Sequence, residues 1–202
     1  MKTGVVSTFL GLLAFYICED VLWRFDEHTF HPDFLTTSIS QPMERKQQPD
    51  NKSLIGEKFP MIAAETLAGK PITLPQDLND NVCVLTVAFK QAAQAKIDTW
   101  SEYVLDTRNF QEVCYYEIPL IKRIWKPLQG WIDGGMRSGI PEGRHNNVIT
   151  YYGDIRPYKR HLNVDDTADA YVFVIDKAGR IRYVERGYAS PEKLQELKKL
   201  LN

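Results

Sequence analysis

The chain has 202 residues, of which 44% are hydrophobic and 25% are charged, and its formal net charge is −1. This composition is that of one folded domain with a tail, and it excludes a disordered or fibrous protein. A charge so close to zero also excludes bulk attraction to nucleic acid, so we predict no nucleic-acid partner.

The first predicted element is an apolar run over residues 5–17, which follows a single Lys2 and precedes several acidic residues. The run is shorter than the roughly 20 residues of a spanning helix. It therefore predicts an uncleaved anchor or signal-type segment over residues 1–35, through which the chain associates with a membrane. The charges favour an N-inside, C-outside orientation. An amphipathic helix packed on the domain is the alternative.

The folded domain is expected over residues 54–202, after a polar linker over residues 36–53 without periodicity. It opens with two short apolar segments on either side of the turn signal at residues 67–70, which predicts a β-hairpin. Residues 82–89 are continuously apolar and β-branched, as in a strand buried on both faces.

A helix over residues 91–107 and a strand over residues 110–119 are predicted next. Residues 120–135 then predict a helix that is kinked at Pro127 and ends at Gly134 and Gly135.

The pattern of residues 144–154 does not distinguish a strand from a loop. Residues 170–176 predict a third strong strand, which a tight turn joins to residues 180–186. The last helix is predicted to start after Ser190 as its N-cap.

This order of elements predicts an α/β fold of the thioredoxin-like type, with a mixed central sheet flanked by helices and an N-terminal β-hairpin extension. Two stretches carry a resemblance: "GEKFP…TLAGKPITLP" near the start and "YVFVIDKAGRIRYVERGYASPEKLQEL" at the end. They resemble the redoxin branch of the thioredoxin-like superfamily from about Ile55 to Asn202.

Catalytic members of that superfamily carry a cysteine at a strand-to-helix corner and a cis-proline before the third strand. The corner here reads "KQAAQ", residues 90–94, and the proline position falls on or next to Ala170. Alanine and glutamine cannot perform thiolate chemistry. The resemblance therefore predicts that this corner is not enzymatic.

Cys83 and Cys114 fall inside predicted strands, where buried structural cysteine is the common state. A disulfide between them would need Cβ atoms that face each other across neighbouring strands. We do not expect one.

A second resemblance lies mainly in the last third of the chain. It rests on residues 170–176 and 180–183, and on a further set of single positions: Pro141, Arg144, His145, Gly187, Ala189, Pro191 and Glu192. This pattern resembles the mitochondrial ATP synthase assembly factor ten family, a cysteine-poor thioredoxin-like group.

Members of that family are implied to be chaperone-like factors for a membrane subunit of the ATP synthase, without enzymatic activity or a cofactor. The resemblance therefore implies that this chain binds a membrane protein subunit. The mitochondrial inner membrane and the periplasmic face of a bacterial envelope are the two locations it implies.

Five residues are candidates for partner binding: Trp125, Trp131, Arg144, His145 and Arg182. The two tryptophans, with Lys122, Arg123 and Lys126, would form an aromatic and basic surface for a partner or for lipid headgroups. The alternative is a helix whose stripe of Leu120, Ile124 and Leu128 packs in the core while its charges are solvated.

Arg144 and His145 form either a binding pair, a proton-handling site or part of a surface loop. Arg182 alternates with Ile181 and Tyr183 and should lie on the opposite face from them, as an exposed anchor or in a salt bridge. No catalytic constellation is present, and we predict no metal site, although His28 and His31 are a weak alternative. Two competing functions stay open: an oxidoreductase with a relocated cysteine, and a small-molecule or metal carrier that uses the corner.

Overall fold

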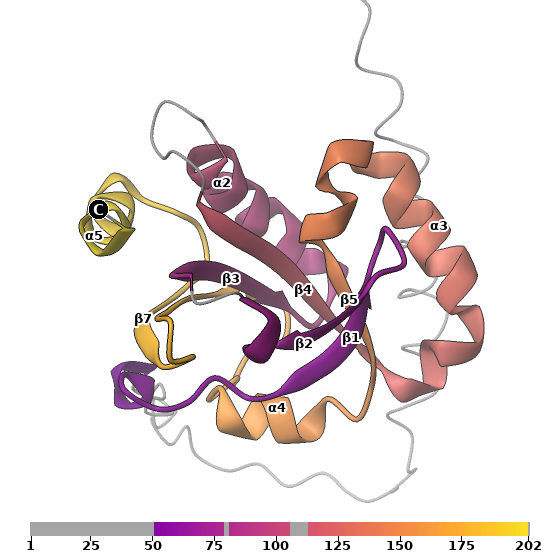
Figure 1. The fold of residues 1–202 in the computed structure, drawn as a ribbon, viewed down its shortest axis with the longest axis horizontal. Coiled ribbons are helices and arrows are strands. Elements are labelled where there is room, and N and C mark those ends of the chain that lie inside the picture. The colour runs from indigo at the N-terminus through magenta and orange to yellow at the C-terminus, as the bar shows by residue number, and fades with distance from the viewer. Residues whose placement is uncertain (1–50, 79–80, 106–112, 202) are drawn as a thin grey trace, which may run out of the picture.

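A single mixed sheet of seven strands organises the computed structural model, which describes residues 51–78, 81–105 and 113–201. The strand order is β2-β1-β5-β4-β3-β6-β7, with helices on both faces of the sheet (Figure 1). The strands are β1 (Ile62–Thr66), β2 (Pro71–Leu74), β3 (Cys83–Ala88), β4 (Cys114–Lys122), β5 (Ile149–Gly153), β6 (Tyr171–Ile175) and β7 (Ile181–Arg186).

The helices fall between and after these strands. The α-helices are α2 (Gln94–Val104), α3 (Gln129–Gly139), α4 (Arg156–His161) and α5 (Pro191–Leu201). The 3-10 helices are η2 (Asn51–Leu54), η3 (Gln76–Leu78), η4 (Gln91–Ala93), η5 (Arg123–Leu128) and η6 (Glu142–Asn147).

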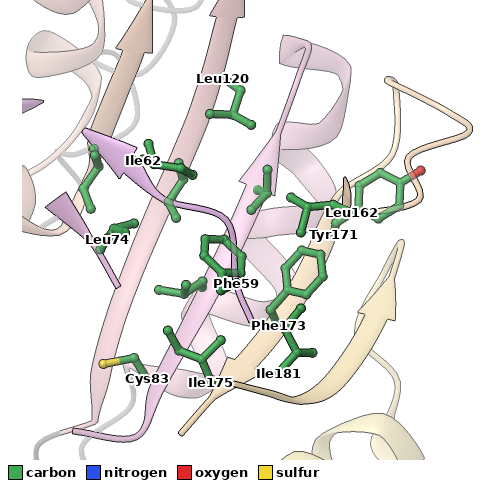
Figure 2. Packing of buried hydrophobic residues seen from close by; sticks show 14 of the residues in the cluster. Phe59, Ile62, Leu74, Cys83, Leu120, Leu162, Tyr171, Phe173, Ile175 and Ile181 are labelled. Carbon is green, nitrogen blue, oxygen red and sulfur yellow. The ribbon is translucent and has the colours of Figure 1, made fainter. Parts of the chain in front are cut away.

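The hydrophobic core forms two layers because the central strands are buried on both faces. In β3, Leu85 and Val87 face a large cluster on the α4 side, which Figure 2 shows around Phe59 and Phe173. Val84 faces the other way and joins Trp100 of α2 in a second cluster that also includes residues of α5. Side chains alternate across a strand, so a continuously apolar run such as β3 fills both layers.

The thioredoxin-like α/β fold and the N-terminal hairpin are confirmed. β1 and β2 pair antiparallel around a turn in which Gly69 has a φ of +77°, a conformation that favours glycine. β3 pairs parallel with β4 and antiparallel with β6. These are the mixed central strands that the sequence pattern predicts.

The helix predicted over residues 120–135 is wrong at both ends. Leu120 to Lys122 continue β4 because they pair with β5, which the sequence pattern did not assign. The α-helix then runs through Gly134 and Gly135 to Gly139, since the positive φ values of the described glycines occur elsewhere. The change from 3-10 to α-helix, one residue after Pro127, is where the predicted kink lies.

The predicted anchor and residues 36–50 lie outside the described residues. The last residues assigned to the linker form η2, whose Leu54 is buried in the core. Within the described ranges, no helix has both the length and the apolar character needed to cross a bilayer.

Candidate functional site

The corner between β3 and α2 is closed by small apolar side chains. Lys90 is extended, η4 makes one turn over the next three residues, and α2 begins at Gln94. Ala93 is fully buried and packs with Ala88, Ile97 and Ala170. The structure therefore brings together the two segments that carry the thiol and the proline in thioredoxin-like enzymes, and here they meet through methyl groups.

Charged groups tie the segment before β6 to α2. The Lys96 ammonium of α2 lies 3.0 Å from an Asp169 carboxylate oxygen and donates to the Ala168 carbonyl at 2.8 Å. Arg186 of β7 lies 2.7 Å from Asp165. The Lys96 contacts hold the segment against α2, the Arg186 contact holds it against β7, and neither depends on a cis-proline.

A buried carboxyl group lies beside this corner on β4. Glu117 is only 5% exposed, and its Oε1 atom accepts a hydrogen bond of 2.6 Å from Arg144 and one of 3.2 Å from the Tyr115 hydroxyl. The side chain of Gln94, the first residue of α2, makes a small contribution that lowers the pKa of this carboxyl group. Glu117 thus lies on the strand next to β3, close to the start of α2, where a catalytic thiol would be held in an enzyme.

Burial raises the pKa of Glu117 above its ordinary value, and the Arg144 charge opposes that rise only in part. Burial also raises the pKa of Tyr115 well above its ordinary value. This hydroxyl therefore stays protonated and donates a hydrogen bond to Glu117. The ion pair joins β4 to η6, and Glu117 depends on Arg144 as its charged partner.

Arg144 and His145 contact different partners within the domain. Arg144 reaches inward to Glu117, and its Nε atom is buried without a hydrogen-bond partner among the described residues. His145 instead bonds through Nε2 to the Ile140 carbonyl just after α3, at 2.9 Å. The carboxylate that Arg144 contacts, Glu117, comes from β4 and could not be identified from the sequence.

The two strand cysteines form a disulfide, so the expectation that they would not is wrong. Cys83 and Cys114 are partners in the parallel register of β3 and β4, and their Cα atoms are 4.5 Å apart. That separation lies within the range of disulfides. The bond lies at the start of both strands, whereas the corner follows the end of β3. The expected burial holds fully for Cys83 and partly for Cys114.

The aromatic and basic segment places apolar side chains in solvent. Trp131 is 51% exposed, Ile124 is 75% exposed and Leu128 is 46% exposed, while Trp125 is half-buried. Only Leu120, which belongs to β4, is buried as the core stripe requires. The alternative of a core-facing stripe is therefore wrong for Ile124 and Leu128.

Arg182 forms a salt bridge rather than standing alone. Its Nε atom lies 2.7 Å from Asp176, across the β6–β7 turn. The neighbours Ile181 and Tyr183 are buried and Arg182 is exposed, as the alternation predicts. Arg182 lies on β7, and Trp131 lies on α3 beyond the other side of the sheet, so the five candidate residues do not form one site (Figure 1).

No cluster of three histidine, cysteine or acidic residues suited to a metal ion occurs in the part of the chain that the structure describes. His28 and His31 lie outside that part.

The fold and the corner define a thioredoxin-like protein without a thiol at the usual reactive position. Comparison with solved structures agrees on the fold. BsSco, a member of the Sco family of cytochrome c oxidase assembly proteins, matches with a TM-score of 0.51 and 10% identity, covering 71% of this chain and 91% of that one. A protein from Bacteroides thetaiotaomicron, described as a protein disulfide isomerase, matches with a TM-score of 0.50 and 19% identity, covering 73% and 87%.

The sequence profile of the ATP10 protein family matches residues 21–202. The chain therefore belongs to the ATP10 protein family, as the resemblance in its last third predicts. A search of curated proteins found no significant match.

Proposed function

We propose that this chain is a non-catalytic, membrane-associated binding protein that assists assembly of a membrane protein complex, the ATP synthase. The observation that carries this proposal is the corner itself. Ala93 and Ala170 fill the contact where an enzyme would hold its thiol and proline, and Glu117 with Arg144 occupies the space beside it. Neither alanine nor an ion pair supplies a nucleophile for disulfide exchange.

Membership of the ATP10 family supports an assembly role. The fold is compatible with that role, because BsSco has the same fold and belongs to a family of assembly proteins. The client would be a membrane-embedded subunit of the synthase, at the mitochondrial inner membrane or the bacterial envelope. The apolar run over residues 5–17 would keep the chain at that membrane.

Affinity capture of the full chain from detergent-solubilised membranes tests the proposal. After brief chemical cross-linking, mass spectrometry should identify a membrane subunit of the ATP synthase as the enriched product. An unrelated tagged protein with a similar membrane segment is the control. Recovery of general chaperones alone, at the level of that control, would count against an assembly role.

An oxidoreductase with relocated cysteines is the second candidate, because Cys83 and Cys114 are joined. Cys83 is fully buried and the pair is remote from the first turn of α2, which is where a helix end would stabilise a thiolate. We expect purified protein to show no turnover in a disulfide-reduction assay. Turnover that disappears in Cys83→Ser and Cys114→Ser variants, but persists in Cys18→Ser, would establish the enzyme instead.

A carrier that uses the corner would need space there for its ligand. Ala93 and Ala170 are both fully buried and belong to the same apolar cluster. This packing leaves such a ligand little room. Thermal-shift measurements with metal ions and small acids test this alternative directly, since a ligand that binds the folded state raises the melting temperature.

A further inference from the structure

We infer that the outer face of η5 and α3 is a docking surface for an anionic lipid bilayer. We call it the η5–α3 face and define it by Arg123, Ile124, Lys126, Leu128 and Trp131. The inference concerns the folded domain, and it does not depend on which client the protein binds.

Three large apolar side chains of this face are solvent-exposed at spacings of four and three residues. Ile124, Leu128 and Trp131 are 75%, 46% and 51% exposed. Transferring such side chains from water into an apolar environment is favourable because of the hydrophobic effect. Exposed apolar residues clustered within three helical turns, rather than scattered singly, are typical of an interaction surface.

Contacts on the inner side of the same segment fix its orientation and keep the three apolar side chains on its outer side. Ile132 and Asp133 face the sheet and are buried, and an Asp133 carboxylate oxygen accepts a hydrogen bond of 2.8 Å from the Tyr152 hydroxyl of β5. Arg137 donates through Nε to the Leu67 carbonyl in the β1–β2 turn at 2.7 Å. The helix is therefore fixed in rotation, and Trp131 is exposed on its outer side. α3 itself lies at the edge of the molecule (Figure 1).

The charges around the apolar residues select the kind of partner. The segment from Ile118 to Ile132 contains three cationic residues and no acidic residue, in a molecule whose net charge is −1. Arg123 and Lys126 are exposed, and neither forms a salt bridge with a described residue. Glu65 lines the same shallow pocket as Lys126 without pairing with it.

This combination suits a bilayer better than a protein groove. Tryptophan settles at the boundary between headgroups and acyl chains, aliphatic residues insert below it, and lysine or arginine contacts anionic headgroups. Each basic residue near an anionic surface adds a modest, salt-sensitive attraction. Because α3 lies at the edge of the domain (Figure 1), its exposed side chains can meet a membrane without any change of fold.

Fluorescence quenching by brominated acyl chains tests the inference in the full chain. Trp23→Phe and Trp125→Phe leave two indoles: Trp131 on the face and Trp100, which is fully buried in the core. With vesicles that contain phosphatidylglycerol, we expect bromolipid to quench the emission. The quenching should disappear when Trp131→Phe is added, which assigns it to the face rather than to an N-terminal anchor.

Charge reversal tests the headgroup contact. Arg123→Glu with Lys126→Glu should weaken docking of the face by at least ~20-fold and abolish quenching. The matched control, Arg160→Glu with Lys177→Glu, changes the net charge equally at two exposed sites elsewhere and should keep it. If the reversed variant misfolds, 0.5 M salt added to the unreversed protein provides the same test, because screening should release the face.

Three results would overturn the inference. The first is a chain that binds vesicles while Trp131 stays unquenched. The second is quenching that is equal in neutral and anionic vesicles and unaffected by salt. The third is a Trp131 that is shielded because two copies of the chain have associated, which would make the face a protein interface.

Discussion

At the residue scale, the buried carboxylate of Glu117 is neutralised by a cation that lies 27 positions further along the chain, Arg144. The carboxylate is almost fully buried, while the Arg144 side chain is 36% exposed. Such a pair contributes little net stability when complete, but removing one partner leaves an uncompensated charge. Arg144 therefore has a structural task in this fold, whatever partner the protein binds.

We expect Arg144→Ala to lower the free energy of unfolding by about 2–3 kcal/mol, because it leaves the Glu117 charge buried without its partner. Chemical denaturation followed by circular dichroism measures this loss. The double variant Glu117→Gln with Arg144→Ala should recover part of it, since no charge then remains buried. Equal losses in Arg144→Ala and in the double variant would mean that the uncompensated Glu117 charge is not the cause of the loss.

The raised pKa of Glu117 gives a pH dependence of known sign. The folded state holds this proton more tightly than the unfolded chain, so the stability it contributes is full below the ordinary pKa of 4.5 and is lost as the pH rises through the raised pKa. The free energy of unfolding of the wild type, minus that of Glu117→Gln, should therefore decrease as the pH rises above 4.5. A difference that grows with pH would mean that folding lowers this pKa.

At the element scale, local patterns predicted β3 and β6 because their residues are apolar in a continuous run, and α5 because its leucines recur at the helical spacing. They did not predict β5, which has only five residues and gains its place by pairing with β1 and β4. Nor did they predict α4, a short basic helix that begins with Pro157 in its first turn. Both are set by tertiary contacts rather than by their own sequence.

The course of α3 through its glycines leads to a stability prediction. Gly134 lies in the helix interior and a Cβ atom there would meet nothing within 4 Å. Gly134→Ala should therefore raise the free energy of unfolding by about 0.5–1 kcal/mol, because alanine loses less backbone entropy in a helix.

Gly69→Ala is the matched control for that change. Its φ of +77° is a left-handed conformation, so the same added methyl group should destabilise the protein by about 1 kcal/mol. If Gly134→Ala were equally destabilising, the helix would end at the glycines after all. Thermal unfolding of both variants decides between these outcomes.

At the scale of the whole molecule, residues far apart in the sequence meet in ways that the chain order alone did not reveal. The thioredoxin-like order of elements could be predicted, and so could the replacement of the thiol and proline by other residues. The partner of Arg144 and the pairing of Cys83 with Cys114 could not, because both depend on the register between strands. A shift of one residue in that register would place the two sulfur atoms on opposite faces of the sheet.

The disulfide closes a loop that contains β3, the corner and α2, with a sequence separation of 31. Restricting the unfolded chain in this way should stabilise the protein by about 3 kcal/mol. Cys83→Ser should therefore lower the denaturation midpoint, whereas Cys18→Ser should not. Reductant should shift wild type to the same extent and leave Cys83→Ser unchanged. Intact mass under non-reducing conditions should be lower by two hydrogens than the reduced mass.

The short connection from the end of α3 to β5 has a mechanical consequence. It carries His145, which holds the carbonyl of Ile140, and Arg144, which enters the interior as far as Glu117. A displacement of α3 would thus be transmitted to the middle of the sheet through these two side-chain contacts. Amide hydrogen exchange should therefore change first in residues 140–148.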